Sequence, residues 1–139
     1  MIAIDTSALM AIALNEPDGH LHLARLRQAK RALLSTVTAV EARMVTYGRL
    51  GPRGVVLLDD LLATPVFHIV PTGPAEMEAA FNAFVAYGKG SGHPAGLNFG
   101  DVFSYALAKS RHLPLLFKGE DFSRTDVVPA MANPQPNRH

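Results

Sequence analysis

The sequence predicts an α/β fold, a three-layer α/β/α sandwich around a short parallel sheet of four or five strands. Short apolar runs, such as "IAI" at 2–4 and "VFHIV" at 66–70, alternate with longer segments that have helical spacing. Short apolar runs bounded by turn residues indicate buried strands. Strands that alternate with helices are typical of a parallel sheet that is covered on both faces.

Turn and cap residues separate the expected elements. Asp5, Thr6 and Ser7 are N-cap types that directly follow the first apolar run, so this strand is expected to lead straight into a helix. Proline and glycine mark further breaks, for example at Gly51 and Pro52. The expected strands are 2–4, 32–36, 66–70 and 113–117, and the expected helices are 8–14, 20–31, 38–50, 53–63, 75–88 and 98–111.

Length and composition favour a single globular domain over residues 1–132. The chain has 139 residues, of which 48% are apolar and 18% charged, enough apolar material for one core. A net charge of +1 gives no broad basic field of the kind that marks a dedicated nucleic-acid binder, although a nucleic acid can still be a transient substrate. The Pro- and Asn-rich stretch 133–139 is expected to be a disordered tail.

Cysteine content and hydropathy limit the kinds of site and the cellular locations that this chain can have. The chain has no cysteine, which excludes disulfides, thiol catalysis and cysteine-based zinc sites. The first ten residues carry no basic segment and include Asp5, unlike a signal peptide. No apolar run reaches membrane-spanning length, so we expect a cytoplasmic protein that does not contact a membrane.

Four acids fall at positions where a parallel sheet gathers ligands. Asp5 follows the first expected strand, Glu41 lies at the start of the helix after the second, and Asp121 follows the fourth. Asp101 opens a helix that can face the same edge. Ligands of open parallel sheets bind beyond the carboxyl ends of the strands, and clustered carboxylates need a counter-charge. The pattern therefore predicts a site for Mg²⁺ or Mn²⁺, which prefer oxygen ligands.

Each acid also has a local explanation. Asp5 can cap the first helix, and Glu41 lies three residues after Thr38, the spacing of a capping box. Asp101 can offset the dipole of its helix, and Asp121 can be a solvated loop acid. The four acids carry more weight as a set, because chance does not readily place all of them at one edge of a sheet.

Several stretches resemble a known family. The motifs "MIAIDTSAL", "STVTAVEA", "GKGSGHPAGLNFGDVFSYALAK" and "LLFKGEDFSRTDV" are similar to the PIN domain, specifically to the VapC toxins of VapBC toxin–antitoxin systems. They occur in order from residue 1 to about residue 130, and the third is the most specific. The acidic residues of the family fall on Asp5, Glu41, Asp101 and Asp121.

The resemblance implies a Mg²⁺-dependent endoribonuclease, with Mn²⁺ as the other candidate ion. The four acids would act as catalytic residues and metal ligands, with Asp5 and Asp101 as the principal ones, and metal-activated water would hydrolyse RNA. The family's small hydroxyl residue falls on Thr6 or Ser7, which the sequence does not distinguish. Two further residues are expected to support the pocket: Asn98 and Lys118.

The resemblance also implies partners. VapC toxins are held inactive by a VapB-like antitoxin, which can place Arg or Lys in the acidic pocket, and they usually form homodimers. Two expected helices, at 20–31 and 53–63, have apolar stripes that are candidate antitoxin contacts: Leu21, Leu26, Leu33, Val56, Leu57 and Leu61.

Two other functions stay open from the sequence. A receiver-like signalling module is also a parallel α/β domain with an acidic pocket and a lysine after a late strand, here Lys118, but it expects adjacent acids after strand one. A catalytically inactive PIN-like scaffold is the other. It is disfavoured because every expected acid is present.

Overall fold

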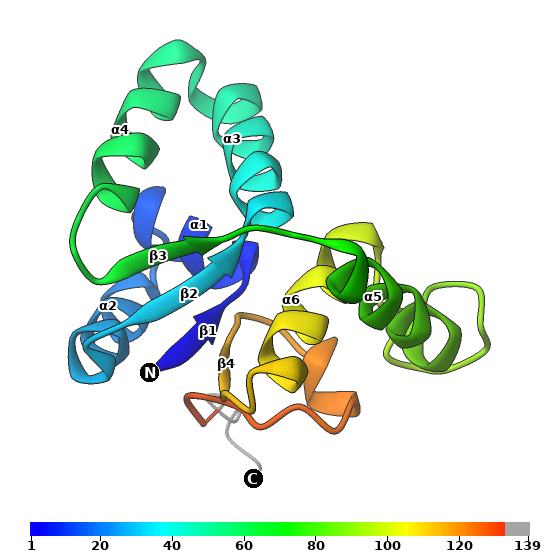
Figure 1. Ribbon diagram of the computed structural model, residues 1–139. Coiled ribbons are helices and arrows are strands. Elements are labelled where there is room, and N and C mark those ends of the chain that lie inside the picture. Colours follow the sequence, from blue (N-terminus) through cyan, green and yellow to red (C-terminus); the bar gives the residue numbers. More distant parts are fainter. Residues whose placement is uncertain (133–139) are drawn as a thin grey trace, which may run out of the picture.

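The computed structural model describes residues 1–132 and contains four strands in one sheet (Figure 1). The strands are β1 Ile2–Ile4, β2 Ala32–Ser35, β3 Phe67–Val70 and β4 Leu115–Leu116. Their order across the sheet is β3-β2-β1-β4, and all three pairings are parallel. The predicted parallel sheet is confirmed, and β1 lies inside it between β2 and β4.

Within the described residues, six α-helices cover the two faces of this sheet. They are α1 Thr6–Ala13, α2 Gly19–Ala29, α3 Thr36–Leu50, α4 Pro52–Leu62, α5 Pro74–Tyr87 and α6 Phe99–Ser110. Helices α1 to α4 contribute buried residues to one apolar core, and α5 and α6 contribute to a second core. Figure 1 shows these two groups of helices on opposite sides of the strands. The predicted three-layer α/β/α sandwich is confirmed.

Strand β1 is apolar throughout because both of its faces are buried, whereas His68 and Ile69 of the edge strand β3 are exposed. Ile2 and Ile4 of β1 belong to the core beneath α1 to α4, whereas Ala3 belongs to the core beneath α5 and α6. In β2, Leu34 and Leu33 divide in the same way. Successive side chains of a strand point to opposite faces, so one short apolar run supplies both cores.

The break between α3 and α4 depends on a glycine. Gly51 has a φ of 68°, in the left-handed region that only glycine adopts without strain. Pro52 then opens α4, where its missing N–H costs nothing because the first turn of a helix has no partner for it. The predicted boundary at Gly51 and Pro52 is therefore confirmed.

Several predicted boundaries were wrong by one or two residues, and two of these differences have a clear physical reason. Helix α3 begins at Thr36, two residues before the expected start at Thr38, because the Ser35 side chain accepts a hydrogen bond from the Thr38 N–H and caps the helix. Strand β4 covers only Leu115–Leu116 instead of 113–117. The short β1 offers β4 few residues to pair with, and Pro114 lacks the N–H that a ladder needs.

Three expectations concerned the whole chain: its membrane contact, its single domain and its tail. Across residues 1–132, no helix combines the length and apolar character needed to cross a membrane. Both apolar cores lie against the same sheet. The predicted disordered tail, 133–139, lies outside the described residues.

We expect Leu34→Ala to lower the free energy of unfolding by about 2–5 kcal/mol, because it removes buried contacts and leaves a cavity. Leu34 is fully buried, at 0% exposure, in β2. The matched control is Leu57→Ala on α4, where the side chain is 58% exposed, and its effect should stay within about 0.5 kcal/mol. Urea unfolding followed by circular dichroism measures both, and equal losses would contradict the assigned core.

Candidate active site

Asp5 lies directly beyond β1 and is held by hydrogen bonds at both carboxylate oxygens. Its Oδ2 accepts from the backbone N–H of Ser7 at 3.0 Å and from the Ser7 hydroxyl at 2.7 Å. Its Oδ1 accepts from the hydroxyl of Ser104, on α6, at 2.5 Å. The helix-capping role of Asp5 is thus confirmed, and it does not exclude a ligand role, because a carboxylate has about four lone-pair sites.

Glu41 reaches the site from α3 and is held by Thr6. The Thr6 hydroxyl donates to Oε1 of Glu41 at 2.5 Å. Burial raises the pKa of Glu41, the hydrogen bond from Thr6 opposes this rise, and the nearby charge of Asp5 adds to it. The sequence left open whether Thr6 or Ser7 supports the acids, and the structure shows that both do. Thr6 binds Glu41, and Ser7 binds Asp5.

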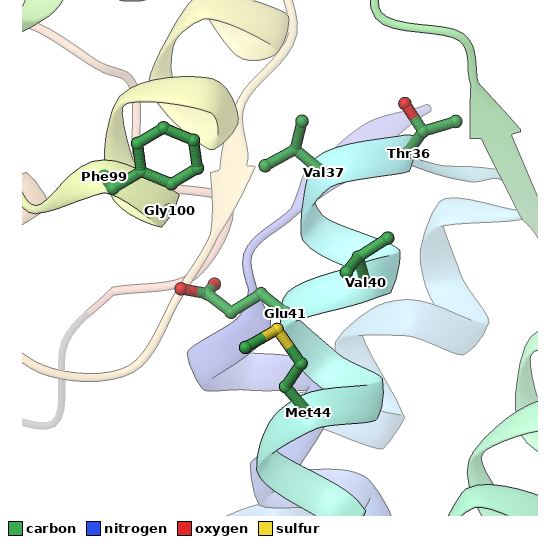
Figure 2. Close-up of a pocket in the computed structure, with 7 residues that line it drawn as sticks. All are labelled: Thr36, Val37, Val40, Glu41, Met44, Phe99 and Gly100. Atoms are coloured by element: carbon green, nitrogen blue, oxygen red, sulfur yellow. The ribbon is translucent and has the colours of Figure 1, made fainter.

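The Glu41 carboxylate lies against the start of α6, where glycine makes room for it. A Cβ atom at Gly100 would come within 2.0 Å of Oε2 of Glu41. Figure 2 shows the Glu41 side chain extending from α3 toward Gly100 and Phe99. The alternative capping box between Thr38 and Glu41 is wrong, because Ser35 is the N-cap of α3.

Asp101 lies in the first turn of α6 and forms a capping box with Asn98. The backbone N–H of Asn98 donates to Oδ2 of Asp101 at 3.0 Å, and the Asp101 N–H donates to Oδ1 of Asn98 at 2.9 Å. Asn98 therefore supports the pocket by fixing the orientation of Asp101. An acid in this first turn also interacts favourably with the helix dipole, as the local explanation supposed.

The electrostatics show that the four predicted acids share one environment. The pKa of Asp101 is raised to about 7, mainly because burial disfavours its charged form. The hydrogen bond from Asn98 opposes this shift, while the charges of Asp5, Asp121 and Glu41 increase it. Asp101 and three acids from other parts of the chain thus come together, as the sequence predicted.

Asp121 and Lys118 lie in the segment after β4. Asp121 is exposed and precedes a short 3₁₀ helix, to which it makes no side-chain capping bond. The backbone N–H of Lys118 donates to the Ser7 hydroxyl at 2.9 Å, which ties this segment to the hydrogen bonds of Asp5. The Lys118 ammonium instead pairs with Glu16 at 2.9 Å and Asp18 at 3.1 Å. Lys118 therefore supports the pocket through its backbone.

Sequence reasoning missed Ser104. It lies three residues after Asp101 on α6, so both side chains are on one side of the helix. Ser104 is 1% exposed, among apolar neighbours of α6, and donates to Asp5. The only available signal was one small polar residue one turn after a predicted metal ligand.

The donor set fits a hard divalent cation. Within residues 1–132, no three His, Cys, Asp or Glu side chains are arranged to hold a metal ion by themselves. Mg²⁺ does not require such a cage, because it keeps several waters and is usually bound by one or two carboxylates. Asp5 and Asp101 are the carboxylates that could hold such an ion, and the charges of Glu41 and Asp121 act on the same pocket.

Comparison with known proteins identifies the family. The PIN domain model matches residues 2–128. Ribonuclease VapC30 of Mycobacterium tuberculosis is 43% identical over 127 residues, which cover 91% of this chain and 96% of the relative. The chain belongs to the PIN-domain family of VapC ribonucleases. The resemblance inferred from the sequence is confirmed.

Solved VapC structures share the fold. Mycobacterium tuberculosis VapC20, described as a sarcin-ricin loop cleaving toxin, aligns with a TM-score of 0.75 at 19% identity, covering 92% of this chain and 97% of that one. VapBC2 from Rickettsia felis, bound to a DNA fragment from their promoter, aligns with a TM-score of 0.72 at 14% identity, covering 93% of this chain and 96% of that one.

The receiver-like alternative is wrong, because the strand order β3-β2-β1-β4 and the family both differ from those of a receiver module.

In the metal-free protein, we expect Asp101 to make stability fall as pH rises from about 4 to about 7. The folded state keeps its proton up to a pKa of about 7, whereas the unfolded state loses it near the ordinary value of 3.8. The folded state thus binds more protons in this window, which favours it at the lower pH. Asp101→Asn should remove this contribution, as measured by urea unfolding at several pH values. Parallel pH profiles for wild type and variant would refute the shift.

Proposed function

We propose that this protein is a metal-dependent endoribonuclease that acts as the toxin of a type II toxin–antitoxin module. The observation that carries the proposal is the gathering of three carboxylates around that of Asp101, in a chain of the VapC ribonuclease family. The relatives' printed name, ribonuclease, supports RNA as the substrate. A cytoplasmic location is part of the same proposal, because the RNA to be cut lies there.

In this proposal Asp5 and Asp101 are the principal ligands of Mg²⁺, with Mn²⁺ as the alternative ion. Glu41 and Asp121 complete the pocket, directly or through water. The bound ion would supply an activated water and would neutralise charge on the phosphodiester during in-line displacement. The hydrogen bonds to Asp5, Glu41 and Asp101 keep the carboxylates oriented before RNA arrives.

The surface beside Glu41 offers a place for RNA. A hollow of about 470 Å³ adjoins the carboxylate, and most of its lining is apolar (Figure 2). Phe99 stands at its edge with 74% of its surface exposed. Unstacked RNA bases bind on aromatic and apolar side chains, so we propose that a base next to the cleaved phosphate lies here. The hollow is lined by Thr36, Val37, Val40, Glu41, Met44, Phe99 and Gly100.

We expect Asp5→Asn and Asp101→Asn each to slow RNA cleavage at least about 100-fold in Mg²⁺, because each removes a charged metal ligand. Loss of a residue that only orients a metal ligand already lowers activity by about 10–100-fold. The change keeps the side-chain shape. Asp60→Asn, an exposed acid of α4, is the matched control and should cleave at the wild-type rate. Cleavage of a fluorescent RNA is measured with Mg²⁺ and with EDTA.

Two outcomes would overturn this assignment. Wild-type cleavage by Asp5→Asn or Asp101→Asn would remove the acids from the mechanism. An inactive PIN-like scaffold, the remaining alternative, would show no heat on titration with Mg²⁺ or Mn²⁺ in a calorimeter.

The proposal includes two protein partners, an antitoxin of the VapB type and a second copy of the chain. Solved complexes support an antitoxin: one structure that shares the fold is the VapBC2 pair. Two helical faces of the protein expose large apolar side chains, which is typical of interaction surfaces. One face, on α3 and α4, includes Met44, Val56 and Leu57, and the other, on α5, includes Met77 and Phe81.

The structure revises the predicted antitoxin contacts. Leu26 and Leu33 are 2% and 4% exposed and belong to the cores, so their assignment to a partner surface was wrong. Val56 and Leu57 on α4 are more than half exposed and keep the role. We place the antitoxin on α4 and the second copy on α5, because a twofold contact needs one apolar patch that can pack on itself.

Light scattering of the purified chain should give the mass of two copies. Co-expression with its cognate VapB-type antitoxin should give a complex without nuclease activity. Phe81→Glu should reduce the free chain to one copy, because it places a charge in the apolar contact. Leu57→Glu is the matched control and should stay a dimer but bind the antitoxin more weakly.

A monomeric wild type at micromolar concentration would contradict the dimer. An antitoxin complex that still cleaves RNA would contradict the toxin–antitoxin assignment.

A further inference from the structure

A chain of three buried hydroxyl groups leads to the Asp5 carboxylate. The Ser104 hydroxyl lies 2.5 Å from Oδ1 of Asp5 and 3.3 Å from the Thr38 hydroxyl. The Ser35 hydroxyl lies 3.1 Å from the Thr38 hydroxyl. These residues come from the end of β2 and from two helices, α3 and α6, so the chain joins three elements beneath the acidic pocket.

The direction of these hydrogen bonds is determined by their two ends. A carboxylate only accepts, so Ser104 gives its single proton to Asp5 and must accept from Thr38. Thr38 in turn accepts from the Ser35 hydroxyl, which itself accepts the Thr38 backbone N–H at 3.0 Å. Every donor therefore points toward Asp5. Hydrogen bonds aligned in one direction polarise and strengthen one another.

Burial keeps water from taking over the hydrogen bonds of these hydroxyl groups. Ser104 and Thr38 are each 1% exposed, and Ser35 is 5% exposed. The terminal torsion of an aspartate is broad, so the plane of a carboxylate is fixed mainly by its hydrogen bonds. Ser7 holds one oxygen of Asp5, and Ser104 holds the other. Without Ser104, the carboxylate would lose its support on the side of α6.

Helix α6 also supplies Asp101, one turn before Ser104. The same helix thus carries Asp101, one principal ligand of the proposed metal, and binds Asp5, the other, through a hydrogen bond from Ser104. We infer that Ser104 is a positioning residue whose hydroxyl, oriented by Thr38, fixes the Asp5 carboxylate so that Asp5 and Asp101 present oxygens to the same divalent cation. This inference rests on the proposed function of the acidic pocket.

The test compares three variants of the full-length chain, with Mn²⁺ as the probe. Ser104→Ala removes the hydroxyl that Asp5 accepts, and Thr38→Val removes the hydroxyl that orients Ser104. Thr46→Val is the matched control: Thr46 is also 1% exposed, but its hydroxyl donates to the Ala42 carbonyl on α3 at 2.6 Å. Calorimetry gives the dissociation constant for Mn²⁺, and thermal unfolding without metal gives stability.

We expect Ser104→Ala to weaken Mn²⁺ binding about 10-fold or more, in the range for residues that orient metal ligands. Thr38→Val should weaken it by a smaller factor, about 3-fold, because one polarising bond is lost. Thr46→Val should bind Mn²⁺ as the wild type does, even if its melting temperature falls. In single-turnover cleavage at saturating RNA, raising the Mn²⁺ concentration should restore much of the rate of Ser104→Ala.

The outcomes separate this inference from the proposed function. A wild type that neither binds Mn²⁺ nor cleaves RNA defeats the proposed function. A wild type that binds Mn²⁺ while a folded Ser104→Ala binds equally well overturns the positioning role alone. If Ser104→Ala does not fold, Thr38→Val decides the matter, because valine keeps the shape of threonine. Wild-type affinity in that variant then overturns the inference.

Discussion

The burial of Asp101 close to three other carboxylates, at one edge of the sheet, is the constraint on which the site depends. Asp101 lies where burial and three other acids raise its pKa to about 7. Such a group holds a proton until something better balances the charge. The fold therefore maintains an environment that favours cations, which is what the proposed metal ion requires.

The protein holds these acids with neutral donors. Backbone and hydroxyl groups bind Asp5, Glu41 and Asp101, whereas the Lys118 ammonium is drawn away to Glu16 and Asp18. Neutral donors orient a carboxylate without cancelling its charge. The same bonds also begin helices, because Asp5 caps α1 and Asp101 closes the capping box of α6. Local helix capping and ligand orientation are thus served by the same atoms, and the two interpretations of these acids do not compete.

Much of the fold followed from patterns along the chain. A strand that is buried on both faces has to be apolar, as β1 is. Gly51 and Pro52, which separate helices α3 and α4, act through their own backbone geometry. The site acids were also predictable, because parallel strands bring the segments after their carboxyl ends to one edge. Boundaries were predicted less well, as at α3, where Ser35 rather than Thr38 became the cap. Both residue types cap helices, and the structure uses Ser35, the last residue of β2, so that α3 follows the strand directly.

The sequence by itself determined the elements, their parallel arrangement and the acids at their ends, since these depend on residues that are near one another in the chain. Only the tertiary structure decided which side chains meet across elements. It assigned Thr6 to Glu41, set Gly100 against the Glu41 carboxylate, and placed Ser104 under Asp5, 99 residues away in sequence. Hydrogen bonds of this kind depend on distances of a few tenths of an ångström between packed helices. A linear pattern cannot specify such distances, because they result from how all the side chains of both cores pack together.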